Sequence, residues 1–212
     1  MKITKLGHCC LLLEDAGVKL MTDPGSFTIE AQEQVTGLDA IVITHEHQDH
    51  FHAESVKKLL EKNPHAVVVT NAAVGKLLKD LRLEHVQVGD GESAEVKGIK
   101  IEGFGKDHAI IYGEMGKCEN TGYFIAEKFY FPGDNFHVPG KKVDILALPV
   151  AGPWMKMSEA IDFAKAVEAR VAFGVHDAMI QTFFRGFVGN ILKMFVPGTE
   201  YVALADGEAR EF

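Results

Sequence analysis

Residues 40–50 constrain this chain more than any other segment. Residues 40–44 form an uninterrupted run of apolar and β-branched residues, which is typical of a β-strand buried on both faces. The run ends directly at His45-Glu46-His47-Gln48-Asp49-His50, where three histidines and an aspartate fall within six positions. For a chain with this content of histidine and aspartate, chance produces the pattern in about one case per thousand. The segment therefore predicts a fold that gathers functional groups at the end of a buried strand.

The spacing within this segment suits metal ligands. Residues two apart point the same way on an extended chain but not on a helix, so His45 and His47 can hold one ion. Asp49 and His50 follow where the chain can bend into a helix, and they can meet a second ion. Imidazole and carboxylate suit zinc, manganese or iron, and no thiolate is present here to favour a structural zinc site. A solvated histidine-rich loop is the alternative interpretation.

The rest of the chain predicts two halves that each run from strands to helices. We expect one α/β (α+β) domain over residues 1–212, built as a four-layer αββα sandwich with two mixed sheets inside and helices outside. Strands are expected at 3–6, 9–13, 18–22, 40–44, 67–70, 123–126, 128–131, 144–150, 171–175 and 201–205, with a strand pair within 92–104. Helices are expected at 53–62, 72–81, 158–168 with Ser158 as the cap, and 178–195.

Charge and hydropathy exclude several classes of partner. The net charge of −8 argues against binding to nucleic acid or to an anionic membrane surface. The N-terminus lacks the layout of a signal peptide, and no apolar run approaches the ~20 residues of a membrane span. Three cysteines, two of them adjacent, suit reduced thiols rather than a disulfide framework. We therefore expect a cytoplasmic protein that acts on a small-molecule substrate.

Three more polar residues lie at the ends of predicted strands. These are His108, Asp134 within a Pro-Gly-Asp turn, and His176, which directly follows the strand expected at 171–175. Functional groups gather at strand ends in layered sheets, but position alone does not decide the role of any of the three. His176 could instead cap a helix, and Asp134 could be an ordinary turn aspartate.

Residues 44–50 resemble the signature of the metallo-β-lactamase superfamily. His108, Gly133-Asp134 and His176 match the further metal ligands of that family in order and approximate spacing. Leu6-Gly7-His8, together with Thr22-Asp23-Pro24, resembles more narrowly the small hydrolases related to ascorbate-6-phosphate lactonase. The resemblance covers essentially the whole chain and implies the αββα sandwich with a dinuclear metal centre.

The resemblance also implies a ligand set for two divalent ions. The side chains are His45, His47 and His108 for one ion, and Asp49, His50 and His176 for the other. Asp134 would bridge the two ions. The residues that flank His108 are not typical of the family, so His137 is an alternative for that place. Zinc is the first expectation for both ions, with manganese or iron as alternatives.

This centre predicts a metal-dependent hydrolase of a small ester, lactone or phosphoester. A water held between two cations has its pKa lowered toward about 7, which yields hydroxide at neutral pH. Asp49 and Asp134 are the candidate catalytic carboxylates, because Asp49 could orient the nucleophile or pass a proton onward and Asp134 would hold both ions. His8 is expected to line the pocket, and Asp23 to accept a hydrogen bond from a ligand imidazole.

Two other functions stay open. One is a metal-binding regulatory protein without turnover. The other is a di-iron oxidoreductase of the same fold, a branch that carries glutamate where His47 stands here.

Several residues near the predicted site have two interpretations. Trp154 and Met155 could form an apolar pocket wall or pack in the core, and Arg185 and Lys156 could bind an anionic substrate group or stay solvated. The phenylalanines between 183 and 195 predict helix core or a subunit contact, so a homo-oligomer is also open.

Overall fold

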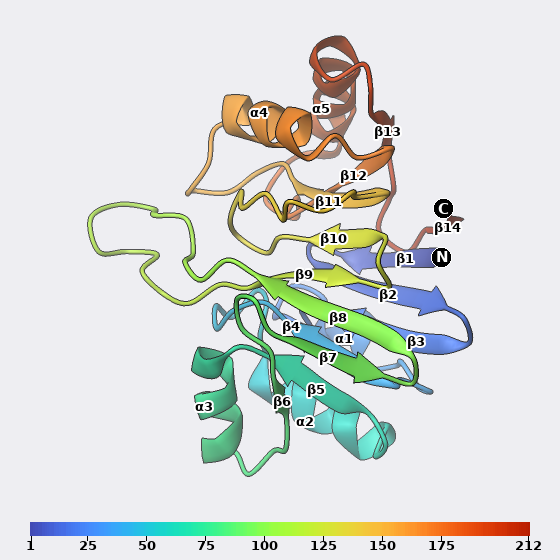
Figure 1. Ribbon diagram of the computed structural model, residues 1–212, viewed down its shortest axis with the longest axis vertical. Helices are drawn as coiled ribbons and strands as arrows, with labels where there is room; N and C mark the ends of the chain where they lie inside the picture. Colours follow the sequence, from blue (N-terminus) through green and yellow to red (C-terminus); the bar gives the residue numbers. More distant parts are fainter.

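The computed structural model describes residues 1–212 as two seven-stranded sheets stacked face to face, with helices outside (Figure 1). The first sheet has the strand order β14-β1-β2-β3-β4-β5-β6, and the second has the order β13-β12-β11-β10-β9-β8-β7. The strands of the first sheet are β1 (Lys2–Gly7), β2 (Cys10–Asp15), β3 (Val18–Thr22), β4 (Ala40–Ile43), β5 (Val67–Thr70), β6 (Val86–Gln87) and β14 (Ala209–Glu211). Those of the second are β7 (Ser93–Val96), β8 (Ile99–Phe104), β9 (Gly122–Ile125), β10 (Phe129–Phe131), β11 (Ile145–Pro149), β12 (Val171–Val175) and β13 (Glu200–Val202). The helices are α1 (Ile29–Gln32), α2 (Ala53–Lys62), α3 (Ala72–Asp80), α4 (Met157–Val167) and α5 (Thr182–Phe195).

Three apolar clusters define the layers. The largest has 24 buried residues from both sheets, among them Val42 of β4 and Phe173 of β12, and it fills the space between the sheets. A cluster of 12 residues joins the first sheet to α2 and α3, and one of 15 joins the second sheet to α4 and α5. Figure 1 shows these two helix pairs at opposite ends of the molecule. The four-layer αββα sandwich expected from the sequence is confirmed.

Both sheets are mixed in the same way. Each combines an antiparallel part with a parallel part, and β4 and β11 each lie between two parallel neighbours. All side chains of these two strands are buried, as their continuous apolar sequences require. Parallel neighbours end at the same edge of a sheet, so the residues that follow β3, β4, β10 and β12 come together there. These residues include Asp23, His45, Asp134 and His176.

The two helices of the C-terminal half begin at different residues than predicted. The helix expected from 158 begins at Met157, and its cap is Lys156 rather than Ser158, because Lys156 keeps an extended backbone and its amide donates to the Glu159 carboxylate at 2.6 Å. The helix expected from 178 begins only at Thr182, after a turn in which His176 has a φ of 57°. At 14 residues α5 is the longest helix, and no helix has the length and apolar character that a membrane crossing requires.

Candidate metal centre

Imidazoles and carboxylates from both sheets converge at one edge of the sandwich. The ligand atoms of His45, His47, His108 and Asp134 lie within 4.8 Å of one another, and those of His8, Asp49, His50 and His176 form a second such group. Asp134 lies between the groups. Its Oδ1 is 3.2 Å from His50 Nε2, and its Oδ2 is 3.0 Å from His176 Nε2 and 3.3 Å from His108 Nε2.

The loop after β3 supports the segment that follows β4. Residues 45–50 form a tight turn in which the His50 amide donates to the His47 carbonyl at 2.9 Å. Gly25 packs directly beneath this turn, because a Cβ at that position would lie 1.8 Å from the Asp49 carbonyl oxygen. The Ser26 amide also donates to the Gln48 carbonyl at 2.7 Å. The backbone that carries Asp49 and His50 is therefore fixed from below by a neighbouring strand end.

Four of the imidazoles share one orientation, in which Nδ1 faces an oxygen acceptor and Nε2 faces the cluster. The acceptors are Thr44 Oγ1 for His45 at 3.0 Å, Asp23 Oδ2 for His50 at 2.6 Å, the Ala109 carbonyl for His108 at 2.5 Å and the Ala151 carbonyl for His176 at 2.6 Å. An imidazole that donates from Nδ1 keeps the lone pair on Nε2 free, which is the state of a metal ligand.

His47 has the opposite orientation. Its Nδ1 lies 3.2 Å from His45 Nε2, whereas its Nε2 points outward to Cys118 Sγ at 3.7 Å. His47 therefore presents Nδ1 to the cluster. Its half-exposed ring, with Cys118 behind it, closes the outer side of the first group.

Several buried polar atoms of the centre contact one another at 3.0–3.3 Å without the geometry of a regular hydrogen bond. These include Nε2 of His50, His108 and His176, and Oδ1 of Asp134. An unsatisfied buried polar group costs about 1–3 kcal/mol, so four in one place call for a common partner. Their lone pairs converge, and imidazole nitrogen with carboxylate oxygen is a donor set that suits zinc, manganese or iron. The residues therefore fit the binding of divalent metal ions.

Burial and mutual charge shift the pKa values of the same groups. Burial holds the pKa of His45 well below its usual range. Burial alone would raise the pKa of Asp134, but His50 and His176 outweigh it and hold that pKa well below its usual range. Burial alone would lower the pKa of His176, but Asp134 and Asp49 outweigh it and raise that pKa to about 9. Asp134 is therefore ionised, and a metal ion that binds His176 must displace a proton.

Asp23 lies where the sequence interpretation expects it. Its buried carboxylate accepts hydrogen bonds from His50 Nδ1 at 2.6 Å, from Thr44 Oγ1 at 2.7 Å and from the Thr44 amide at 2.8 Å. Thr44 in turn accepts from His45, so one carboxylate orients an imidazole of each group. Thr44 belongs to the signature segment, but nothing in the sequence predicts a role for its side chain.

His8 and His137 occupy contrasting places. His8 belongs to the cluster, with 1% of its surface exposed and its Nε2 3.1 Å from Asp49 Oδ2. Burial lowers the pKa of His8 to about 4. His137 is exposed beside Gly105 and is in neither group, so the structure brings His108 and not His137 to Asp134.

Sequence reasoning missed the support behind Asp134. Asn120 Oδ1 accepts from the Asp134 amide at 3.0 Å, and Asn120 Nδ2 donates to the Pro132 carbonyl at 2.9 Å. Gly133 has a φ of 64°, and a Cβ there would lie 2.3 Å from Asn120 Oδ1. The Pro-Gly-Asp turn is therefore shaped around Asn120, whose only local signal is its place just before β9.

The remaining candidates divide between core and surface. Trp154 is 7% exposed, and its ring centroid lies 6.1 Å from that of His108 and 5.9 Å from that of His176, so it packs in the core and walls the centre at once. Met155 packs against the apolar cluster under α4 and α5. Arg185 contacts the carboxylates of Asp177 and Asp206. The charge of Arg185 is therefore paired with carboxylates of the protein itself.

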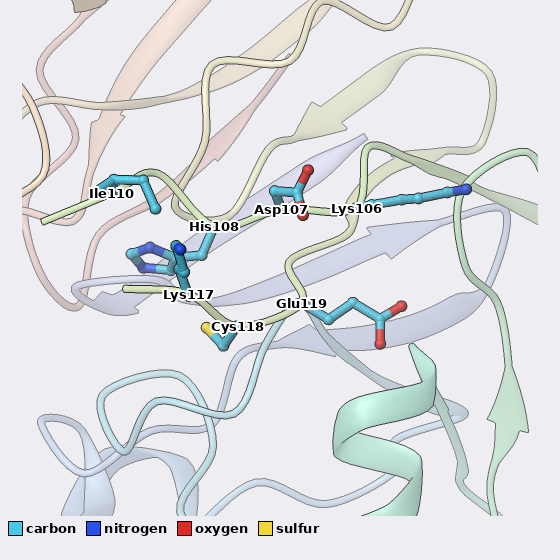
Figure 2. Close-up of a pocket in the computed structure, with 7 residues that line it drawn as sticks. All are labelled: Lys106, Asp107, His108, Ile110, Lys117, Cys118 and Glu119. Atoms are coloured by element: carbon cyan, nitrogen blue, oxygen red, sulfur yellow. The ribbon is translucent and has the colours of Figure 1, made fainter. Parts of the chain in front are cut away.

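A cavity of about 690 Å³ opens beside His108. It lies along the loop of residues 105–121, which projects from the body of the molecule between β8 and β9 (Figure 1). Figure 2 shows the lining residues, with Lys106 extending away from the His108 imidazole. They are Lys106, Asp107, His108, Ile110, Lys117, Cys118 and Glu119. His108 is the one residue of the cluster that lines this cavity, and its side chain is fully buried.

Comparisons with known proteins identify the family to which this chain belongs. The family model described as the beta-lactamase superfamily domain matches residues 2–176. Protein Rv0786c of Mycobacterium tuberculosis is 35% identical over 219 residues, which cover 100% of both chains. A UPF0173 metal-dependent hydrolase of Thermoplasma acidophilum is 27% identical over 83% of both chains. In fold, the chain is similar to Igni18, a metallo hydrolase of Ignicoccus hospitalis, with a TM-score of 0.79 and 21% identity over 100% of this chain and 98% of that one. The chain therefore belongs to the metallo-β-lactamase superfamily and is a metal-dependent hydrolase.

Proposed function

We propose that this hydrolase uses two divalent ions to cleave a small ester, lactone or phosphoester. The first ion would be held by His45, His47 and His108, the second by Asp49, His50 and His176, with Asp134 between them. The observation that carries the proposal is the set of buried, partnerless nitrogen and oxygen atoms that point at one another from both sheets. Zinc is the first candidate for both ions, and the same ligands accept manganese or iron.

The ions, when bound, would act as Lewis acids and lower the pKa of a nearby water toward about 7. The protein contributes fixed positions and proton acceptors. Asp134, with 3% of its side chain exposed, is held by Asn120 and has no freedom to follow a substrate. Asp49 has 24% of its side chain exposed, and its neighbours His176 and His8 outweigh burial and hold its pKa below the usual range. Asp49 is therefore an ionised, accessible carboxylate that can accept a hydrogen bond from an attacking water and orient it.

The cavity beside His108 supports a small substrate. Its volume of about 690 Å³ falls within the range typical of small-ligand pockets. Ile110 supplies an apolar contact, and Lys106 and Lys117 are balanced in the lining by the carboxylates of Asp107 and Glu119. The mixture suits a small acyl or phosphoryl compound with both apolar and polar parts.

Metal reconstitution followed by turnover tests this function. The chelator-stripped protein is refilled with zinc or manganese, its metal content is counted by mass spectrometry, and hydrolysis of a lactone, a phosphodiester and a thioester is followed. We expect two ions per chain and metal-dependent hydrolysis of at least one compound. His108→Ala should lose metal and turnover, whereas His137→Ala, its exposed counterpart, should keep both. Two bound ions without turnover on any compound would contradict the proposed reaction, and a chain that binds no metal would contradict the centre.

A further inference from the structure

His8 differs from the other imidazoles of the cluster in what its Nδ1 faces. The Ala178 amide donates to His8 Nδ1 at 3.4 Å. A neutral imidazole that accepts a hydrogen bond at Nδ1 carries its proton on Nε2. That Nε2 lies 3.1 Å from Asp49 Oδ2, so the N–H donates to the carboxylate. An imidazole in this state has no free lone pair at Nε2, although its ring lies among the ligands of the second ion.

We propose that His8 is a positioning residue that holds Asp49 and the segment around His176 in the geometry that binds the second ion. The inference rests on the proposed function, because it assigns His8 a role within that centre.

The contacts of His8 join two segments that lie far apart in the sequence. Its carbonyl accepts from the His176 amide at 3.2 Å, and its ring packs against the His176 ring with 4.2 Å between centroids. Its Nδ1 accepts from Ala178 on the far side of the same turn, and its Nε2 donates to Asp49. One side chain and one carbonyl therefore fix the distance between Asp49 and His176, two of the proposed ligands of the second ion.

The backbone at His8 has a strained conformation that these contacts stabilise. His8 has a φ of 50°, and the register between β1 and β2 shifts between Lys5 and Gly7. A non-glycine residue with positive φ costs about 1–3 kcal/mol and persists only where its surroundings determine it. At His8, the hydrogen bonds to Asp49, His176 and Ala178 hold the backbone in this conformation.

Lys5 strengthens the same attachment from the other side. Its fully buried Nζ donates to the Gly174 carbonyl at 2.9 Å and to Asp177 Oδ2 at 2.6 Å. The end of β1 thus holds the chain both before and after His176. A shift of this strand end would move the His176 imidazole relative to Asp49.

Asparagine and glutamine at position 8 form a matched pair that tests the role. Asparagine tolerates positive φ but is one methylene too short to reach Asp49, whereas the amide of glutamine reaches the place of the imidazole Nε2. Zinc titration of the stripped proteins gives the two affinities, and His47→Ala and His176→Ala assign them to the first and second ion. The melting temperature of each metal-free variant controls for folding.

We expect His8→Asn to lower the affinity for the second ion about 10- to 100-fold, as for other residues that orient metal ligands. The affinity for the first ion should change by less than about 2-fold. His8→Gln should recover most of the loss. X-ray absorption should count the same number of imidazoles per zinc in the wild type and in both variants. Unchanged affinity for the second ion in His8→Asn would overturn the inference. The loss of one imidazole would overturn it as well, because His8 would then be a ligand. A wild type that binds fewer than two ions would instead refute the proposed function itself.

Discussion

Replacing Asp23 by asparagine should weaken metal binding without removing an atom of any proposed ligand. The three groups that face the Asp23 carboxylate are all donors: His50 Nδ1, the Thr44 hydroxyl and the Thr44 amide. A carboxylate satisfies all three, because each oxygen accepts. Asparagine has the same volume but replaces one oxygen with an NH₂ group, and neither orientation of the amide fits the three donors.

The cost follows from the two orientations. If the NH₂ faces His50 Nδ1, the proton of His50 must move to Nε2, and the lone pair that faces the cluster is lost. If it faces the Thr44 amide instead, two buried donors oppose each other at a cost of about 1–3 kcal/mol. Loss of such an orienting partner lowers metal affinity about 10- to 100-fold. That range corresponds to about 1.4–2.7 kcal/mol of binding free energy.

Competition between the stripped protein and a chromophoric zinc chelator measures this loss. We expect Asp23→Asn to lower the affinity for the ion nearest His50 by about 10- to 100-fold. Asp107→Asn, an exposed aspartate of the cavity outside the cluster, is the matched control and should bind as the wild type does. If Asp23→Asn bound both ions as tightly as the wild type, the reasoning about proton positions in the centre would be wrong.

Three further changes test other parts of the structure. Asp134→Ala should lose both ions together and His47→Ala mainly the first, each with loss of activity but retention of fold by circular dichroism; full turnover in chelator-treated buffer would refute the assignment. Lys5→Met removes a buried partner 2.6 Å from Asp177, which keeps its contact with Arg185, and should lower the free energy of unfolding by about 1.5–3 kcal/mol in a urea titration; a loss below about 1 kcal/mol would show that the pair is not important for stability. The pKa of His176 is raised from 6.5 to about 9, so its contribution to the stability of the metal-free protein is complete below pH 6.5 and is lost as the pH rises through 9. The melting temperature of the metal-free wild type should therefore fall over this range more steeply than that of His176→Asn, and equal slopes would contradict the shift.

Local pattern was sufficient for most of the fold. The strands β3 and β5 and the helix α2 have the predicted bounds, because the strands are short apolar runs and the helix is an amphipathic run, each between turn residues. The sequence did not indicate β14, whose three exposed residues form a strand only because β1 offers its edge. The late start of α5 has a similar cause, because residues 176–178 are bound to His8 and Arg185 before the helix begins.

The candidate site likewise has one part that local sequence predicts and another that depends on tertiary structure. The spacing of His45, His47, Asp49 and His50 is a local property, and one strand end is enough to explain it. His108, Asp134 and His176 join this segment only because the sheets meet at this edge, where the Thr121 amide donates to the Thr44 carbonyl at 3.0 Å. No local pattern encodes that meeting, so these three rested on the family resemblance. The hydrogen bonds of Asn120 and the proton position on His8 depend on side-chain geometry, which a sequence does not contain.

Diffraction from crystals of the zinc-loaded protein, measured on both sides of the zinc absorption edge, tests the centre most directly. We expect two anomalous peaks, both in contact with Asp134. Their other neighbours should be His45, His47 and His108 for one peak, and Asp49, His50 and His176 for the other. A single peak, or peaks away from these side chains, would contradict a dinuclear centre built from both sheets.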